Sequence, residues 1–337
     1  MKLKKYQVDI LFLLSGFIII FFSAIRSLTV GTDTSSYYEW YQTLFNNDST
    51  LSNLILINLN DNEPAFVFIN FIFVFFNFNY FIALSVYSTI FWTISYFSFK
   101  NERKYIYLTI FFFITTGILF FTFNAVRQSL ALCLVFYSVK FIFNKKFLPF
   151  SFLILLASLF HFSAILLIPI YFVNRLNQVT RNTWIVAFVV SLFFPISLLF
   201  KPIYWLIDFF PSYGGYLISS RFTEAKLISL GVVYQILLGF LAIFYYPIVA
   251  TDKKIKLYFH LFFIGEIAYH LFYGSFFILR FVVYLLFFQP FVYTYIFKHL
   301  LLQKKFLDIF LITFYFLIMF LYKILMSDSG CSPYSFF

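Results

Sequence analysis

Long apolar stretches separated by short polar or basic turns run along nearly the whole chain. A helix that crosses the hydrocarbon core of a bilayer needs about 20 mostly apolar residues. On this measure the pattern predicts about 11 transmembrane helices, at about 8–28, 79–99, 105–122, 124–143, 147–160, 162–173, 184–200, 227–248, 257–274, 276–297 and 306–326. The expected fold is therefore all-α, with residues 1–337 forming a single multi-spanning membrane domain.

Two apolar stretches do not have the length of a simple span. The run that begins after Glu63 has about 13 residues and carries Asn70, so it is predicted as an outer-side re-entrant or interfacial helix near 63–77. The stretch 147–173 is too long for one span and short for two. We interpret it as a tight hairpin whose tip lies near His161.

Composition agrees with a membrane protein. Hydrophobic residues make up 63% of the chain and charged residues only 11%, against about 25% charged residues in an ordinary soluble domain. These values exclude a soluble enzyme, a disordered protein and a nucleic-acid-binding domain. The two cysteines, Cys133 and Cys331, cannot make a disulfide framework.

The net charge of +11 is first an indicator of topology. With eleven spans, 14 of the 17 lysines lie on the cytoplasmic side, and no Lys or Arg occurs from Ser27 to Phe99. Cytoplasmic loops carry the excess of Lys and Arg in membrane proteins. The pattern therefore predicts a multi-pass protein of a cytoplasmic membrane, with its N-terminus inside and its C-terminus outside.

The arginines are distributed differently from the lysines. Four of the seven fall on the predicted outer half, namely Arg26, Arg127, Arg221 and Arg280. A guanidinium stays charged and binds phosphate through two parallel hydrogen bonds. The set therefore predicts a site for an anionic headgroup. The alternative is that each arginine reaches lipid phosphate or pairs with a local carboxylate.

Two carboxylates lie on the same predicted side as these arginines. Asp33 follows a Gly31-Thr32 turn seven residues after Arg26, so it is a candidate base or a group that orients Arg26; a helix cap is the equal alternative. Glu63 opens the predicted re-entrant helix, where it either suits the helix dipole or acts as a base. Tyr37, which follows Asp33 by one helical turn, is suited to the membrane interface or to stacking on sugars.

Two further polar segments fall inside apolar surroundings. Arg127 and Gln128 open the helix predicted at 124–143, where free backbone N–H groups also favour an anion. His161, at the predicted hairpin tip, is either a hydrogen-bonded structural group or a base that accepts a hydroxyl proton. Both readings of His161 stay open at the level of sequence.

The segment before Arg280 carries an intramembrane acid. Glu266 and His270 are four residues apart and share a helix face, within reach of Arg280 at the start of the next helix. We expect Glu266 to support Arg280 or His270. The sequence has no nucleotide-binding glycine loop, no HExxH and no CxxC, so it predicts no cofactor and no metal site.

Several motifs in chain order resemble the EpsG family, within the group of Wzy-type O-antigen and exopolysaccharide polymerases. They are Arg26 with Val30-Gly31-Thr32-Asp33 and Tyr37, Glu63, the segments 124–131 and 157–164, Arg280 with Tyr284, and Pro333-Tyr334. The match covers most of the chain, and the Arg-x₃-Val-Gly-Thr-Asp segment is its most specific part. The segment 201–222 does not align, so Arg221 has less support than the other arginines.

The resemblance implies a polysaccharide polymerase in a bacterial cytoplasmic membrane. Such enzymes join undecaprenyl-pyrophosphate-linked repeat units at the outer face, with membrane lipid around them and a chain-length regulator and a flippase as possible partners. In that reading Arg26, Arg127 and Arg280 bind pyrophosphate, and Asp33, Glu63 or His161 acts as base or orienting group. Supporting roles fall to Gln128, Glu266, His270 and Arg221.

Two alternatives compete with a polymerase. A flippase for lipid-linked oligosaccharides needs cations that line a cavity reachable from both sides. A glycosyltransferase that uses a lipid phosphosugar needs a catalytic Asp in its first outer loop, where Asp33 lies, but Asp33 has no second acid within five residues. Because the intramembrane charges gather on the predicted outer half, the polymerase is the first hypothesis.

Overall fold

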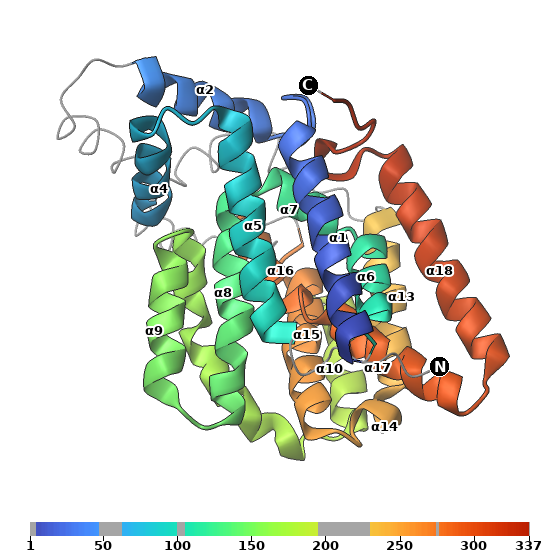
Figure 1. Cartoon of the computed structure of the whole chain (residues 1–337). Helices are drawn as coiled ribbons and strands as arrows, with labels where there is room; N and C mark the ends of the chain where they lie inside the picture. Colours follow the sequence, from blue (N-terminus) through green and yellow to red (C-terminus); the bar gives the residue numbers. More distant parts are fainter. Residues whose placement is uncertain (1–4, 47–62, 100–104, 195–229, 274–275, 337) are drawn as a thin grey trace. The chain divides into compact units, whose positions relative to one another are not determined.

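The computed structural model describes residues 5–46, 63–99, 105–194, 230–273 and 276–336, and this part of the chain is helical apart from one isolated bridge between Arg26 and Phe336 (Figure 1). Its contacts divide into two compact units. Unit 1 comprises 1–138, 152–162 and 307–337, and unit 2 comprises 139–151 and 163–306. The prediction of one membrane domain over 1–337 stays a prediction.

Unit 1 contains the first helices of the chain and the last one. Its elements are α1 (Lys5–Ile25), α2 (Thr34–Asn46), α4 (Pro64–Phe75), α5 (Tyr80–Phe99), α6 (Ile106–Thr115), α7 (Ile118–Asn124), most of α8 (Val126–Phe143), the second half of α9 (Phe147–Ser158), α18 (Phe306–Leu325) and the short η7 (Asp328–Gly330). Helix α1 packs along α5, where Phe12 stacks on Trp92 with ring centroids 4.6 Å apart. Helix α2 lies across the end of α5 and contacts α4 (Figure 1).

Unit 2 is built around α15 (Lys253–Leu271). Its other elements are η2 (Phe162–Gln178), α10 (Arg181–Phe193), α13 (Leu230–Phe244), α14 (Tyr246–Val249), α16 (Phe276–Leu286) and α17 (Gln289–Leu302), with the start of α9. Asp252 begins α15 as its N-cap, because its carboxylate accepts the backbone N–H groups of Lys254 and Ile255 at 2.8 and 3.0 Å. Helices α10, α13, α16 and α17 all pack against α15.

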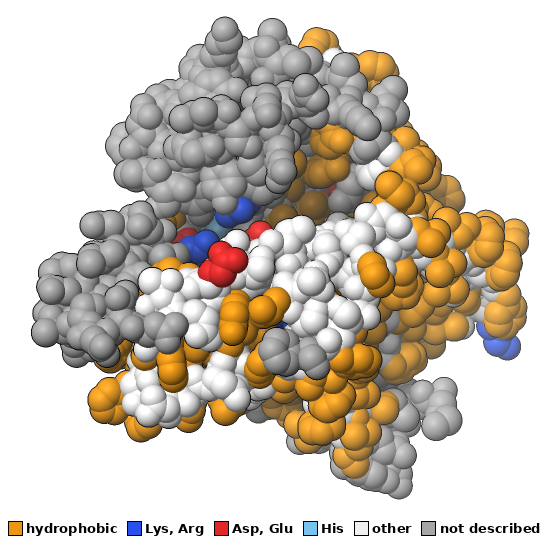
Figure 2. Space-filling model, turned by 90° about the horizontal axis from the view of Figure 1, so that it is seen from above, with side chains coloured by type: hydrophobic (Ala, Val, Ile, Leu, Met, Phe, Trp, Pro, Cys, Tyr) orange, Lys and Arg blue, Asp and Glu red, His pale blue; other side chains and the backbone are white. Residues whose placement is uncertain are grey.

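The helices have the apolar surface of a membrane protein. Four are long and apolar enough to cross a bilayer, Tyr80–Ser98, Val126–Phe143, Leu279–Leu302 and Phe306–Leu325, and the bent pair α6–α7 makes a fifth if it is one span. On α18, Leu307 is 70% exposed and Leu325 82% exposed, and hydrophobic side chains cover much of the visible surface in Figure 2. Such a surface suits lipid and not water, so the chain is an integral membrane protein.

Each of the eleven predicted spans coincides with helix in the described residues, although several of these helices are short. The span predicted at 105–122 is not straight: α6 and α7 meet at a bend of 65°. Gly117 takes φ +81 at this bend, and an added Cβ would lie 2.7 Å from Nζ of Lys323. The bend therefore depends on a residue without a side chain.

The two irregular stretches also form helices. The segment predicted near 63–77 is α4, which ends at Phe75, and its polar Asn70 donates to the carbonyl of Phe66 at 2.8 Å. The stretch 147–173 folds back on itself between α9 and η2. Within unit 2, Tyr171 of η2 contacts Phe147 and Phe150 near the start of α9, as expected for a hairpin.

Candidate functional site

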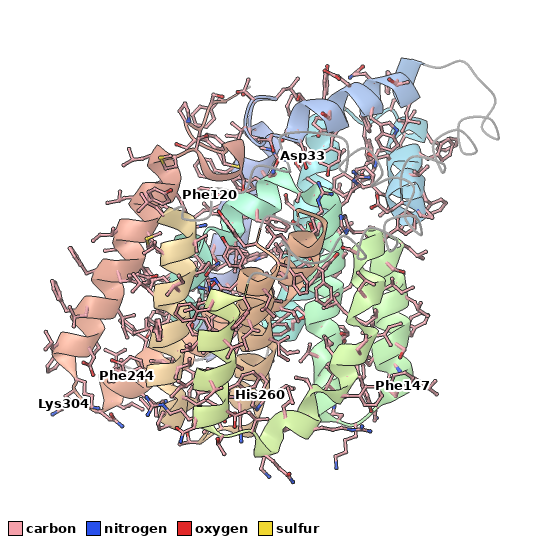
Figure 3. The ribbon with its side chains drawn as sticks, turned by 180° about the vertical axis from the view of Figure 1, so that it is seen from behind. Asp33, Phe120, Phe147, Phe244, His260 and Lys304 are labelled. Atoms are coloured by element: carbon pink, nitrogen blue, oxygen red, sulfur yellow. The ribbon has the colours of Figure 1, made fainter. Side chains whose placement is uncertain are left out.

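The loop that joins α1 to α2 is held in place by the end of α7. Gly31 takes φ +93, and a Cβ there would lie 2.7 Å from the hydroxyl of Thr34. The side-chain oxygen of Asn124 accepts the backbone N–H of Asp33 at 2.8 Å and the hydroxyl of Thr32 at 3.1 Å. These contacts fix Asp33 near the beginning of α8, and Figure 3 shows Asp33 and Phe120 at the same end of unit 1.

Arg127, on the first turn of α8, is paired with Glu63, the residue that precedes α4. Its Nη1 lies 2.5 Å from Oε2 of Glu63. Its Nε donates to the hydroxyl of Tyr37 at 3.4 Å, and its guanidinium carbon lies 5.3 Å from the centre of the Tyr37 ring. Glu63 makes no side-chain hydrogen bond to the N-terminus of α4, so its partner is the arginine.

Tyr37 connects the groups at this end of unit 1. Burial raises the pKa of its phenol, and the nearby Arg127 guanidinium opposes that rise. Asp33 and Glu63 are close enough to act on Tyr37 electrostatically. We call Asp33, Tyr37, Glu63 and Arg127 the Arg127 cluster. From the sequence, Tyr37 was expected to serve only as an aromatic surface, and its contact with Arg127 gives the hydroxyl a second role.

Arg26 follows α1 directly and is fully buried, at 0% exposure. Its Nη1 donates to the Ser23 hydroxyl at 2.8 Å, and its guanidinium lies over the ring of Phe123. Its Nε and Nη2 make no hydrogen bond to the part of the chain that the structure describes. Asp33 makes no hydrogen bond to Arg26, because the one guanidinium nitrogen bonded within the described residues, Nη1, donates to Ser23.

Two further residues of unit 1 that the sequence predicted as site residues, Gln128 and His161, are also buried. Gln128 is 3% exposed and adjoins Arg127 on α8. His161 is 2% exposed and follows the end of α9. The backbone N–H of Ala65 donates to the carbonyl of Leu159 at 3.0 Å, which joins the start of α4 to the hairpin tip. Segments that carry Glu63 and His161 are therefore neighbours.

Unit 2 holds the other predicted residues. Glu266 is fully buried, and Nε2 of His270 lies 3.8 Å from its Oε2, too far for a hydrogen bond. Neither carboxylate oxygen of Glu266 has a hydrogen-bond partner among the described residues, so the expected bond to Arg280 is not formed there. Arg280 lies on α16 one turn before Tyr284, whose hydroxyl accepts from Ser163 at 3.4 Å.

Arg221 lies outside the described residues. Within the described ranges no group of three or more His, Cys, Asp and Glu is arranged to hold a metal ion. The sequence reading missed His260, which is 0% exposed on α15 and lies against the Trp184 ring with centroids 5.4 Å apart. An imidazole within an apolar helix was the available signal.

Comparison with known proteins identifies one family. The model described as the EpsG family matches residues 9–336, nearly the whole chain, and confirms the resemblance drawn from the motifs. No curated protein and no solved structure matches the chain significantly.

Proposed function

The chain belongs to the EpsG family, and on that premise we propose that it is a polysaccharide polymerase. Family membership indicates a role in exopolysaccharide biosynthesis. In our proposal the protein joins undecaprenyl-pyrophosphate-linked repeat units at the outer face of the cytoplasmic membrane. The single observation that carries the proposal is the pairing of Arg127 with Glu63 and Tyr37 at the end of unit 1 where Arg26 also lies.

The reaction needs a cation near the leaving group. The hydroxyl oxygen of the acceptor sugar attacks the anomeric carbon of the donor, and the bond from that carbon to the pyrophosphate oxygen breaks. The electron pair goes to pyrophosphate, and the hydroxyl proton goes to a base. Fixed arginines stabilise the charge that develops on the leaving group, so Arg127 and Arg26 are the proposed pyrophosphate ligands. No nucleotide is consumed, because the donor carries its own leaving group.

Asp33 is the proposed base. Glu63 is already paired with Arg127 at 2.5 Å, and this pair occupies one of its two carboxylate oxygens. The Asp33 side chain is partly exposed and accepts a hydrogen bond from the Thr32 hydroxyl at 3.3 Å. An exposed carboxylate can reach a substrate hydroxyl more readily than one engaged in a buried ion pair. His161, which is buried, is the second choice.

The proposed topology has support within each unit. In unit 1 the loop after α1 bonds to the segment after α18, through Ser27 N–H to the Ser335 carbonyl at 2.9 Å. The ends of α1 and α18 therefore share a side, and the start of α1 lies on the other, as an inside N-terminus and outside C-terminus require. In unit 2, Figure 3 shows Phe147, Phe244 and Lys304 toward one end. Lys304 is one of the lysines that the sequence predicts on the cytoplasmic side.

Arg280 is proposed as a further pyrophosphate ligand. This role rests on the family resemblance and on the position of Arg280 in α16, one turn before Tyr284. Gln128, Glu266 and His270 are proposed as supporting residues. Arg280 belongs to unit 2 and is therefore tested apart from the Arg127 cluster.

The decisive experiment is reconstitution. The purified protein in proteoliposomes, supplied with undecaprenyl-pyrophosphate-linked repeat units and no nucleotide, is expected to produce a ladder of longer glycans on a gel. Liposomes without protein and liposomes with an Arg127→Ala variant are the controls. Transfer of the units across the bilayer without any ladder would contradict the proposal and favour the flippase.

A further inference from the structure

The last segment of the chain covers Arg26. Phe336 pairs with Arg26 in an isolated antiparallel bridge. The Tyr334 hydroxyl donates to the carbonyl of Phe22 on the last turn of α1. Cys331 and Tyr334 are both close enough to Arg26 to act on it electrostatically. The guanidinium that the proposed function assigns to pyrophosphate is thus closed off from any ligand in this conformation.

The contacts of this segment with the loop after α1 are mainly polar and peripheral. The Ser27 and Ser335 hydroxyls lie 2.7 Å apart, and Thr29 bonds to Ser335 at 3.0 Å at the surface. The backbone N–H of Gly31 donates to the carbonyl of Gly330 at 2.8 Å. Water replaces such hydrogen bonds at little net cost in free energy. The other neighbours of Arg26 belong to packed helices, among them Ser23 and Phe123.

We propose that the segment 330–336 is a strap that closes over Arg26 and lifts to admit the pyrophosphate of a lipid-linked substrate. The proposal rests on the proposed function for the identity of the ligand. The observation behind it is that Arg26 is fully buried while its Nε and Nη2 have no hydrogen-bond partner in the described residues. A buried cation with unused donors is costly in free energy, and an anion that enters after the strap lifts satisfies both donors.

The closed position of the strap depends on Gly330. This residue takes φ +66, a conformation that side chains other than glycine rarely adopt. A Cβ added there would lie 2.8 Å from Cγ2 of Thr32 and 3.1 Å from its backbone nitrogen. Because Gly330 has no side chain of its own, replacing it changes the strap without removing a group from the site.

The first test opens the strap and follows Cys331, which is 3% exposed when the strap is closed. Full-length protein with Cys133→Ala is placed in lipid nanodiscs and labelled with a polar maleimide. Gly330→Ala is expected to raise the labelling rate of Cys331 about tenfold, while Ser332→Ala, a change in the same segment without a positive φ, leaves the rate unchanged. An unchanged rate in folded Gly330→Ala would overturn the proposal.

The second test closes the strap covalently. Ser27→Cys with Ser335→Cys, in a background of Cys133→Ala and Cys331→Ser, places two thiols where the hydroxyls are 2.7 Å apart. The oxidised protein is expected to lose binding of radiolabelled undecaprenyl pyrophosphate and to regain it with reductant. Ser335→Cys alone is the control. Equal binding by the oxidised and reduced double variant would overturn the strap.

The two tests separate the strap from the proposed function. If Gly330→Ala exposes Cys331 and the disulfide blocks pyrophosphate binding, the strap is supported even if no variant forms glycan ladders. In that case it is the polymerase proposal that fails. Undecaprenol and inorganic pyrophosphate, offered in place of the lipid pyrophosphate, show which part of the ligand requires the strap to lift.

Discussion

Arg127 in unit 1 and Glu266 in unit 2 are charged or ionisable groups in opposite surroundings. In unit 1, Arg127 is bonded to Glu63 and Tyr37, and its side chain is still 22% exposed. In unit 2, Glu266 and His260 are fully buried, and neither has a hydrogen-bond partner in the described residues. A polar group that is both oriented and reachable can act on a ligand, whereas a buried one acts mainly on its own fold. On this ground we expect the larger effects from the Arg127 cluster of unit 1.

The largest effect is expected at Arg127. Arg127→Ala removes the fork of donors and should lower polymer formation about 10²–10³-fold, with single lipid-linked units accumulating and expression intact. Arg127→Lys keeps the charge but loses the fork of donors. Its polymer formation should therefore lie between that of the wild-type protein and that of Arg127→Ala. Gel analysis of the glycan is the measurement, and Arg175→Ala, at an exposed arginine of η2, is the control. A glycan of normal length made by Arg127→Ala would contradict the assignment of the reaction to the Arg127 cluster.

Arg280 tests whether unit 2 also contributes to the reaction. If it binds pyrophosphate as proposed, Arg280→Ala should reduce polymer formation about 10²-fold and leave the protein folded. Polymer length and detergent-extracted yield are measured together. Full activity would confine the proposed chemistry to unit 1 and sharpen the contrast between the units.

The same substitution in each unit gives a matched comparison. Glu63→Gln leaves Arg127 without its countercharge and should lower polymer formation about tenfold. Glu266→Gln replaces an unbonded carboxyl with an amide of the same shape and should change activity by about twofold or less. Initial rates in proteoliposomes distinguish the two. The reverse order of effects would show that the buried acid, and not the paired one, serves the reaction.

Within the Arg127 cluster the smallest effect is expected from Tyr37→Phe, which keeps the ring and removes the acceptor for Arg127 Nε. Activity should fall about threefold to tenfold. Because burial raises the pKa of Tyr37, the folded protein holds the phenol proton to a higher pH than the unfolded chain. The wild-type protein should therefore lose stability as the pH rises above about 10, and the variant should lose less. Thermal unfolding between neutral and alkaline pH is the measurement; an identical pH dependence would contradict the burial of the phenol.

Much of the fold follows from local patterns. Apolar runs indicated helices at all eleven predicted positions, and the run after Glu63 forms a helix of 12 residues. Its re-entrant or interfacial position stays a prediction. The bend at Gly117 was not predicted; there the backbone takes φ +81, and the side chain of Lys323, about two hundred residues later in the chain, lies close to it. Glycine alone does not distinguish a bend from a straight helix that merely tolerates it.

The candidate site was predicted as a set of residue types but not as a set of contacts. Glu63 was expected beside some outer arginine, and its partner Arg127 is identified only by the structure. The sequence left Asp33 as a base, a group that orients Arg26 or a helix cap, and in the structure Arg26 bonds to Ser23 and not to Asp33. Such pairings depend on how helices pack, and packing is not visible in a local pattern.

The sequence by itself determined the membrane character, the helix positions, the family and the residues worth testing, because hydropathy, charge and short motifs are local properties. Only the tertiary structure decided which charges meet. In that structure Arg127 pairs with Glu63, 64 positions away, and the segment 330–336 covers Arg26. The physical reason is that a bond between distant segments depends on the geometry of the helices between them, and the same residue types allow several pairings until those helices have packed.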